Sequence, residues 1–218
     1  QLRKLCPARP PTVMLRTMRS LPAHNETVSL LGFSAIARAL VSREPRGERL
    51  VIGIDGRTGA GGDVIARQLS FAVGGTVVPV SDFVLPPHRR DDDGGIPVDF
   101  DALREFVLEP AEWGDTIRYP MYRPDDASLI EWVDVPSDGP IIVEGAFAFA
   151  ADLFEQYDAT IFVDCDPSEC RRRRSAVWGD DAAAAWEMVM GESESNYVQG
   201  SAWAHRATFS MDTTQGVR

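Results

Sequence analysis

The sequence predicts an α/β fold built on a parallel sheet, and three observations support this expectation. Continuous apolar runs near 50–55, 141–144 and 160–164 have the length and composition of strands that are buried on both faces. Segments with helical spacing of apolar residues separate them, as in the crossover connections of parallel strands. The chain has 218 residues, of which 44% are hydrophobic. One substantial core, and therefore a single domain over residues 26–218, is expected.

The first expected elements follow a Pro-rich N-terminal arm. Residues 1–25 contain four prolines and scattered arginines, a composition typical of a weakly ordered segment. Capping residues at 25–27 predict a helix that runs to about residue 41, and the Pro-Gly segment 44–47 ends it. The strand at 50–55 comes next, and a glycine-rich turn and a second helix follow it.

Further strands and helices alternate along the rest of the chain. A short apolar strand is expected at 76–80, before a loop at 86–97 whose three consecutive aspartates and two glycines favour a solvated surface position. A helix is expected at 99–108. After the strands at 141–144 and 160–164, a helix is expected from residue 180 onward.

The glycine-rich turn after the first strand resembles a phosphate-binding loop with two changed side chains. In the motif G-x-x-x-x-G-K-[ST], backbone N–H groups hold the phosphates, the Lys contacts the β- and γ-phosphates, and the hydroxyl binds Mg²⁺. Gly56 and Gly61 have the spacing of this motif, whereas Gly62 stands at the Lys position and Asp63 at the hydroxyl position. The turn therefore predicts a nucleotide site without its strongest cation.

Acidic residues follow several of the expected strands. Asp55, Asp82, Glu144 and Asp164 each stand at or just after the end of an apolar run. In open parallel sheets, ligands bind beyond the carboxyl ends of the strands. Asp82 and Glu144 are therefore expected to face one crevice beside the glycine-rich turn.

Composition excludes several classes of function. The formal net charge of -11, without a basic stripe, argues against nucleic-acid binding. The three cysteines form no CxxC pair, which argues against a disulfide framework and a zinc site and favours the cytoplasm. No apolar stretch approaches the ~20 residues that a membrane span needs. A small-molecule substrate is the expected partner, and a homo-oligomer stays open.

Six short segments, in their order and spacing, resemble the uridine kinase and phosphoribulokinase group of P-loop kinases. They are 53–61, 81–83, 99–103, 119–122, 142–148, and 161–166 with the Arg run that follows. The resemblance extends from about residue 49 to residue 212. It implies a three-layer P-loop NTPase-like fold, in which helices cover both faces of a parallel sheet.

The resemblance assigns roles to residues around the expected crevice. It implies that Asp82 is the catalytic carboxylate, which accepts the proton of the substrate hydroxyl, and that Glu144 is the acidic residue near the metal. Tyr122 is implied to lie beside the substrate base, and His88 and Arg89 are further substrate-binding candidates. Ordinary core or surface positions are the alternatives for these three residues.

The resemblance also implies ATP and Mg²⁺ as cofactors. The Arg run 171–174 begins a lid that is expected near 171–190, and its cations are implied to face the phosphates. The expected ATP-binding residues are Gly56, Arg57, Thr58, Gly59, Ala60, Gly61, Gly62, Asp63, Arg173 and Arg174. The expected metal ligands are Asp63, Asp82 and Glu144.

The changed loop leaves two functions open. Loss of the loop Lys removes a contact that is typically worth several kcal/mol, on the order of 10²–10³ in rate. One function is a divergent uridine-kinase-like phosphotransferase, which moves a phosphoryl group from a nucleoside triphosphate to a hydroxyl of a nucleoside or similar small molecule. The alternative is a repurposed kinase scaffold that no longer uses ATP, and that acts as a different small-molecule enzyme or as a ligand-binding protein.

Overall fold

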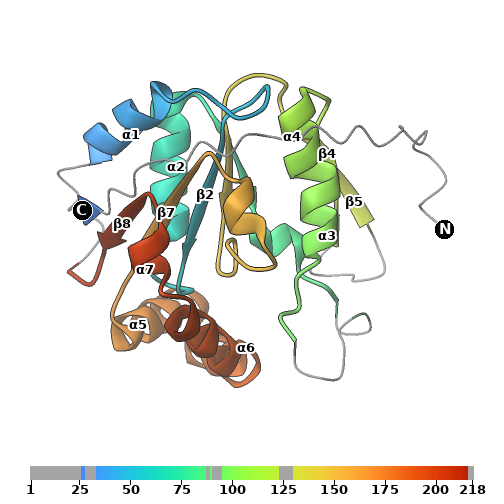
Figure 1. Cartoon of the computed structure of the whole chain (residues 1–218). Coiled ribbons are helices and arrows are strands. Elements are labelled where there is room, and N and C mark those ends of the chain that lie inside the picture. Colours follow the sequence, from blue (N-terminus) through green and yellow to red (C-terminus); the bar gives the residue numbers. More distant parts are fainter. Residues whose placement is uncertain (1–25, 28–32, 87–88, 90–94, 123–129, 216–218) are drawn as a thin grey trace.

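A six-stranded parallel sheet forms the centre of the molecule (Figure 1). The computed structural model describes residues 26–27, 33–86, 89, 95–122 and 130–215. The strands, in their order across the sheet, are β1 (Glu26–Thr27), β8 (Phe209–Asp212), β7 (Ala159–Asp164), β2 (Val51–Gly56), β6 (Ile141–Glu144) and β3 (Thr76–Pro79). Every neighbouring pair is parallel, as the sequence predicts.

Helices cover both faces of this sheet. On one face lie α1 (Phe33–Val41) and α2 (Gly62–Val73). On the other lie α3 (Phe100–Leu103), a π-helical turn at Arg104–Leu108 and α4 (Glu109–Trp113), which follow one another without a break (Figure 1). The expected three-layer α/β arrangement is confirmed.

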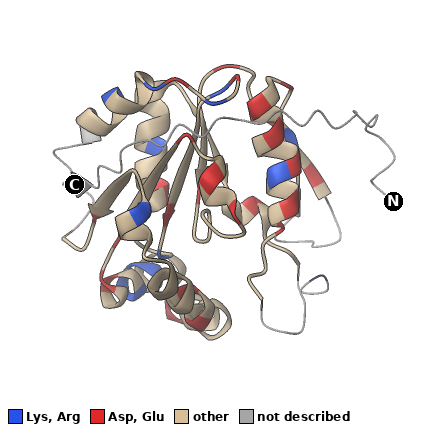
Figure 2. Cartoon of the chain, in the orientation of Figure 1, with Lys and Arg blue, Asp and Glu red and all other residues tan. Residues whose placement is uncertain are grey.

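Two helices lie beyond the carboxyl ends of β2 and β7 (Figure 1). They are α5 (Pro167–Trp178) and α6 (Asp180–Ser201), and the short α7 (Trp203–Arg206) leads from them to β8. Asp166 caps α5, because its side chain accepts a hydrogen bond from the Ser168 N–H at 2.8 Å. The arginines of this region gather on α5, whereas acidic side chains predominate along α3 and α4 (Figure 2).

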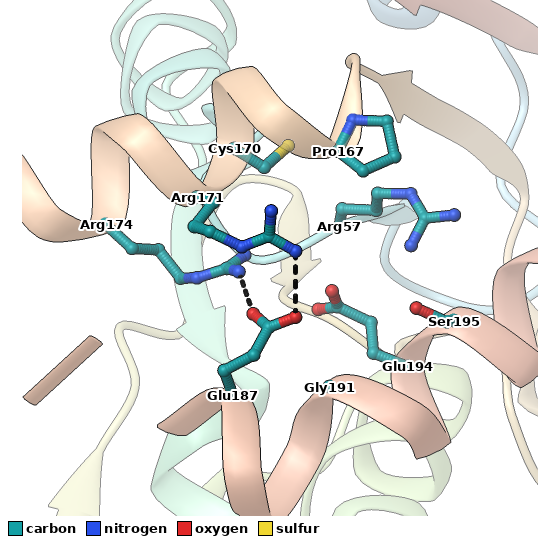
Figure 3. A pocket seen from close by; sticks show the side chains of 9 residues that line it. All are labelled: Arg57, Pro167, Cys170, Arg171, Arg174, Glu187, Gly191, Glu194 and Ser195. Carbon is teal, nitrogen blue, oxygen red and sulfur yellow. Dashed lines mark hydrogen bonds and ion pairs between the residues drawn. The ribbon is translucent and has the colours of Figure 1, made fainter. Parts of the chain in front are cut away.

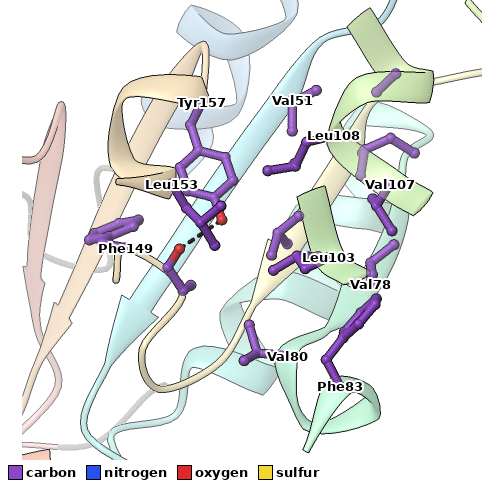
Figure 4. Packing of buried hydrophobic residues seen from close by; sticks show 14 of the residues in the cluster. Val51, Val78, Val80, Phe83, Leu103, Val107, Leu108, Phe149, Leu153 and Tyr157 are labelled. Carbon is purple, nitrogen blue, oxygen red and sulfur yellow. Dashed lines mark hydrogen bonds between the residues drawn. The ribbon is translucent and has the colours of Figure 1, made fainter. Parts of the chain in front are cut away.

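Side chains of β2 alternate between two apolar cores, one on each face of the sheet. Ile52 and Ile54 pack with α1 and α2. Val51 belongs to the other core, which lies between the sheet and the helices α3 and α4. Figure 4 shows this second core, where Leu103 and Val107 face the sheet. A Cβ atom on Gly53 would lie 2.6 Å from the Tyr157 ring, so only glycine lets that ring pack against β2.

Two expectations about helices need correction. The helix expected from residues 25–27 begins only at Phe33, because Glu26 and Thr27 instead pair with Phe209 and Ser210 of β8. The helix expected at 99–108 continues to Trp113 through the π-helical turn. The arm expected at 1–25 lies outside the described residues.

A second, two-stranded sheet was not expected from the sequence. In it, β4 (Arg118–Tyr122) pairs antiparallel with β5 (Ile130–Asp134). Tyr119 is buried in the core below α3, whereas most of β5 is exposed. Among the described helices, none has both the length and the apolar composition that a membrane span requires.

Candidate functional site

The glycine-rich turn has the shape that its sequence predicts. It leads from β2 into α2, and the backbone is left-handed at Gly59 (φ 93°) and at Gly61 (φ 94°). Such φ values are strained for residues with a side chain, so the two glycines fix the path of the turn. The residues 56–62 thus form a loop at the start of a helix, the usual place for an anion.

Glu144 lies beside the position that the missing Lys would occupy. It ends β6 and stands in register with Ile54 of β2 and Pro79 of β3. A Cβ atom on Gly62 would lie 2.7 Å from its Oε1 atom. Burial, together with the negative charges of Asp63 and Asp55, raises the pKa of Glu144 to about 7, and the positive charge of Arg67 acts in the opposite direction. A carboxylate, and not a cation, therefore borders the first turn of α2.

Asp82 lies at the same edge of the sheet, in a 3₁₀ turn (Val80–Phe83) that follows β3. The Tyr119 hydroxyl donates a hydrogen bond to its Oδ2 atom at 2.8 Å. Burial raises the pKa of Asp82, and this hydrogen bond acts in the opposite direction. Because Pro79 pairs with Glu144, Asp82 and Glu144 follow adjacent strands. The two cavities described below are lined by other residues, and a common crevice for Asp82 and Glu144 stays a prediction.

Asp55 is a third carboxyl group at this edge, and it is fully buried. The sequence alone does not predict a specific role for it. Its side chain accepts hydrogen bonds from the N–H groups of Gly56 (2.6 Å) and Phe149 (2.9 Å) and from the Tyr197 hydroxyl. Burial nevertheless raises its pKa to about 7. Tyr197 lies on α6, far along the chain, and no local sequence signal connects it with the loop.

The arginines of α5 reach the glycine loop, but they contact its carbonyl oxygens. Arg173 donates to the carbonyls of Gly59 (3.4 Å) and Ala60 (3.2 Å), and to Glu169 at 2.8 Å. Arg174 donates to the Thr58 carbonyl at 2.6 Å. Both guanidinium groups therefore donate their hydrogen bonds to the protein itself. Their contact with a nucleotide stays a prediction.

Arg174 is held from two further sides. It forms an ion pair with Glu187 of α6, and its guanidinium lies 4.3 Å from the centroid of the Trp186 ring. Its side chain is buried, and its Nε atom has no hydrogen-bond partner among the described residues.

A small cavity of about 40 Å³ opens between the loop, α5 and α6 (Figure 3). Three arginines line it, and the acidic side chains of Glu187 and Glu194 point into it from α6. The lining residues are Arg57, Pro167, Cys170, Arg171, Arg174, Glu187, Gly191, Glu194 and Ser195. Glu194 is buried, and its Oε1 atom accepts a hydrogen bond from the Thr58 N–H at 2.7 Å.

The expected metal ligands do not form a recognisable centre. Asp63 is largely exposed and pairs with Arg67 at 3.0 Å on the surface of α2. In the described part of the chain, no group of three or more His, Cys, Asp or Glu side chains could hold a metal ion. Mg²⁺ binding by Asp63, Asp82 and Glu144 therefore stays a prediction.

The structure describes the three substrate-binding candidates only in part. Tyr122 ends β4 and pairs with Ile130, but its side chain lies outside the description. His88 also lies outside the described residues, and Arg89 is exposed. The second cavity, about 130 Å³, lies at the opposite end of β2, beside Arg49 and Asp158.

Comparisons with known proteins identify the fold. No family model and no curated protein matches the sequence. Many solved structures have a similar fold. One of them is a possible uridine kinase from Bacillus stearothermophilus, with 18% identity, a TM-score of 0.61 and coverage of 83% of this chain and 97% of that chain. Another is a candidate fructose transport system kinase from Silicibacter sp. TM1040, with 19% identity, a TM-score of 0.60 and coverage of 82% of this chain and 98% of that chain.

The chain has the fold of the P-loop kinases. It shares the arrangement of these two structures, which confirms, at the level of the fold, the resemblance that its sequence indicates. The similarity extends over nearly the whole length of the matched structures. At 18–19% identity, this similarity establishes the fold and not the reaction or the ligand.

Proposed function

We propose that the chain is a small-molecule-binding protein on a P-loop kinase scaffold that does not use ATP. The observation that carries this proposal is the surroundings of Gly62. The residue at the Lys position has no side chain, and the Glu144 carboxylate lies against it. A phosphate at this place would meet an acidic carboxyl group in place of the expected cation.

Other groups around the loop support the proposal. Arg173 and Arg174, the cations nearest the loop on α5, donate to loop carbonyls. Asp55 adds a buried carboxyl group at the end of β2, and Asp63 an exposed one in the first turn of α2. A carboxylate at a helix N-terminus interacts favourably with the helix dipole and so competes with a bound phosphate.

The chemistry of this acidic edge defines the ligand class that we propose. Carboxyl oxygens of Asp82 and Glu144 accept hydrogen bonds, so they suit neutral or cationic molecules that carry hydroxyl or amino groups. A carboxyl group with a pKa of about 7, as in Glu144, can both accept and donate a proton at neutral pH. A proton-transfer reaction on such a molecule is compatible with this site. The buried free thiols of Cys165 and Cys170 suit the cytoplasmic location that we expect.

A second candidate is phosphoryl transfer from a nucleoside triphosphate to a substrate hydroxyl. The hydrogen bond from Tyr119 to Asp82 favours it, because it orients a carboxylate at the edge of the sheet where a kinase base would act. This candidate function requires ATP and Mg²⁺. It also requires that cationic side chains, such as Arg173 and Arg174, turn toward the phosphates when ATP binds.

Calorimetric titration with ATP and Mg²⁺ distinguishes the two candidates. We expect no heat of binding for the natural protein at millimolar ATP. The double variant Gly62→Lys with Asp63→Ser restores the motif, and we expect ATP affinity to appear in it. The matched control, Gly62→Ala with Asp63→Ser, restores no cation and is expected to stay silent. Binding of ATP by the natural protein, with competition by ADP, would contradict the proposal.

A further inference from the structure

The second cavity, of about 130 Å³, lies at the amino end of β2, on the face of the sheet that α3 and α4 cover. Val51 and Leu108 are its apolar lining residues, and both belong to the core on that face (Figure 4). The other residues that line it are Arg46, Gly47, Arg49, Glu112, Glu155, Gln156 and Asp158. The glycine loop follows the carboxyl end of β2, so a site in this cavity is separate from the proposed function.

Arg49 is a buried cation in the lining of this cavity, with 9% of the residue exposed. Its Nε atom donates to the Gly139 carbonyl at 3.0 Å, and its Nη2 atom donates to the carbonyls of Asp138 (2.9 Å) and Gly139 (2.8 Å). Among the described residues, no carboxylate forms an ion pair with Arg49, and no acceptor binds its Nη1 atom. Burial lowers the pKa of Arg49, and the negative charge of Asp138 acts in the opposite direction. Because a buried charge without a counter-ion is unfavourable, Arg49 can bind an anionic group.

Asp158 is the buried carboxylate of the same cavity, with 5% of the residue exposed. Its Oδ1 atom accepts from the backbone N–H of Arg46 and its Oδ2 atom from that of Val51, both at 2.8 Å. The Arg46 Nε atom lies 3.8 Å from Oδ1. A carboxylate has about four acceptor positions, so Asp158 keeps the capacity to bind a further donor.

The charges of the lining argue against a ligand with a single charge. Two cationic side chains and three acidic side chains line the cavity. An anion on Arg49 would be repelled by Asp158, Glu112 and Glu155, whereas a cation would leave Arg49 without a counter-ion. A molecule that carries both charges avoids both costs. The volume is close to that of a cavity of about 150 Å³ that holds one benzene molecule, so a ligand of this size is expected.

We propose that this cavity binds a small zwitterion of the amino acid class. The ligand's carboxylate accepts hydrogen bonds from the Nη1 atom of Arg49, in a charge-assisted contact of the kind that guanidinium groups favour. Its ammonium group donates to Asp158. Glu112 and Glu155 add negative potential around that ammonium group, and Val51 and Leu108 contact the carbon atoms between the two charges.

The test is a titration of the isotope-labelled natural protein with L-alanine and with γ-aminobutyrate, two zwitterions that differ in the spacing of their charges. Amide NMR signals locate the site. We expect saturable shifts at residues 46–49, 108–112 and 155–158 with at least one of the two. No saturable shift with either zwitterion, or shifts confined to other regions, would overturn the inference.

Matched probes with one charge test the class of the ligand. Propionate and butyrate lack the amino group of the two zwitterions, and ethylamine and propylamine lack the carboxylate. We expect each of them to bind at least about fivefold more weakly than its zwitterion. Equal affinity of a probe with one charge would contradict the proposed ligand class.

Variants of Arg49 test the contact with the carboxylate. We expect Arg49→Met to weaken binding of the zwitterion at least about tenfold. If this variant does not fold, Arg49→Lys keeps the charge and loses the planar group, and it is expected to weaken binding at least about threefold. The matched control, Arg38→Met, changes an exposed arginine of α1 on the opposite face of the sheet and is expected to have no effect. Unchanged affinity in the Arg49 variants would refute the site, whereas ATP binding bears on the proposed function alone.

Discussion

The Glu144 carboxylate occupies the space into which a side chain at Gly62 would extend, since its Oε1 atom lies 2.7 Å from the place of a Cβ atom there. Two residues 82 positions apart in the sequence thus define the chemistry of the loop together. In a phosphate-binding loop of the usual kind, a Lys would enter this space. Here the space holds an acidic carboxyl group and no cation, which is the physical basis of the proposal that ATP is not used.

The first prediction concerns the pH dependence of stability through Glu144. Its pKa is raised from 4.5 to about 7 on folding, so the folded chain holds the extra proton between these values. Stability is therefore higher below this window and falls as the pH rises through it. Glu144→Gln removes the cost of the buried charge, and we expect it to stabilise the protein by about 2 kcal/mol at pH 8 and by much less at pH 5.

Urea unfolding at the two pH values measures this effect. Glu131→Gln, on the exposed strand β5, is the matched control and is expected to have little effect at either pH. Equal stabilisation by Glu144→Gln at both pH values, or destabilisation at the higher one, would show that folding does not raise the pKa of this carboxyl group.

The second prediction concerns the hydrogen bond from Tyr197 to Asp55. Tyr197→Phe keeps the ring, whose centroid lies 5.0 Å from that of Phe147, and removes only the hydroxyl donor. Loss of a donor to a buried carboxylate is expected to cost about 1–3 kcal/mol. A double-mutant cycle with Asp55→Ala, which removes the acceptor, followed by urea unfolding, isolates the interaction. A coupling free energy close to zero would argue against this contact.

The sequence indicates the sheet well because its central strands carry a local signal. In β2, β6 and β7 nearly every side chain is buried, so they appear as uninterrupted apolar runs. The strand β1 lacks such a signal, since Glu26 acquires its strand conformation by pairing with Phe209 at the other end of the chain. The strand β5 also lacks an apolar run, because most of its side chains are exposed. Its pairing with β4 defines it as a strand.

Some residues of the candidate site also have a local sequence signal, and others do not. Asp82 and Glu144 could be selected from sequence, because they follow apolar runs and such ends meet at one edge of a parallel sheet. Glu194 and Tyr197 could not, because their partners, Thr58 and Asp55, lie more than 130 positions away. Their spacing of three positions on one helix is the only sequence signal that they act together.

The third prediction concerns the fixation of the loop by Arg174. Arg174→Lys keeps the charge but cannot reproduce the planar contacts with the Thr58 carbonyl, Glu187 and the Trp186 ring. We expect a loss of about 1–3 kcal/mol in the free energy of unfolding. Arg172→Lys is the control, because Arg172 is exposed and pairs with Glu169 within the same helix. Equal effects of the two substitutions would refute the role given to Arg174.

The fourth prediction concerns the ionisation of Asp82. The Tyr119 hydroxyl stabilises its charged form, so Tyr119→Phe is expected to raise the pKa of Asp82 further. Titration followed by carbon NMR of the side-chain carboxyl groups measures this change. Asp166, which is held by Ser168 and far from Tyr119 in sequence, serves as the internal reference. If the Asp82 titration does not move, the two side chains are not hydrogen-bonded in solution.

The central claim is that the loop does not take the phosphates of ATP, and phosphorus NMR of ATP with Mg²⁺ tests it most directly. The spectrum is recorded with and without a stoichiometric amount of the natural protein. We predict that the γ- and β-phosphate resonances keep their positions and widths. Protein-dependent broadening or shifts of these resonances, reversed by excess ADP, would contradict the account.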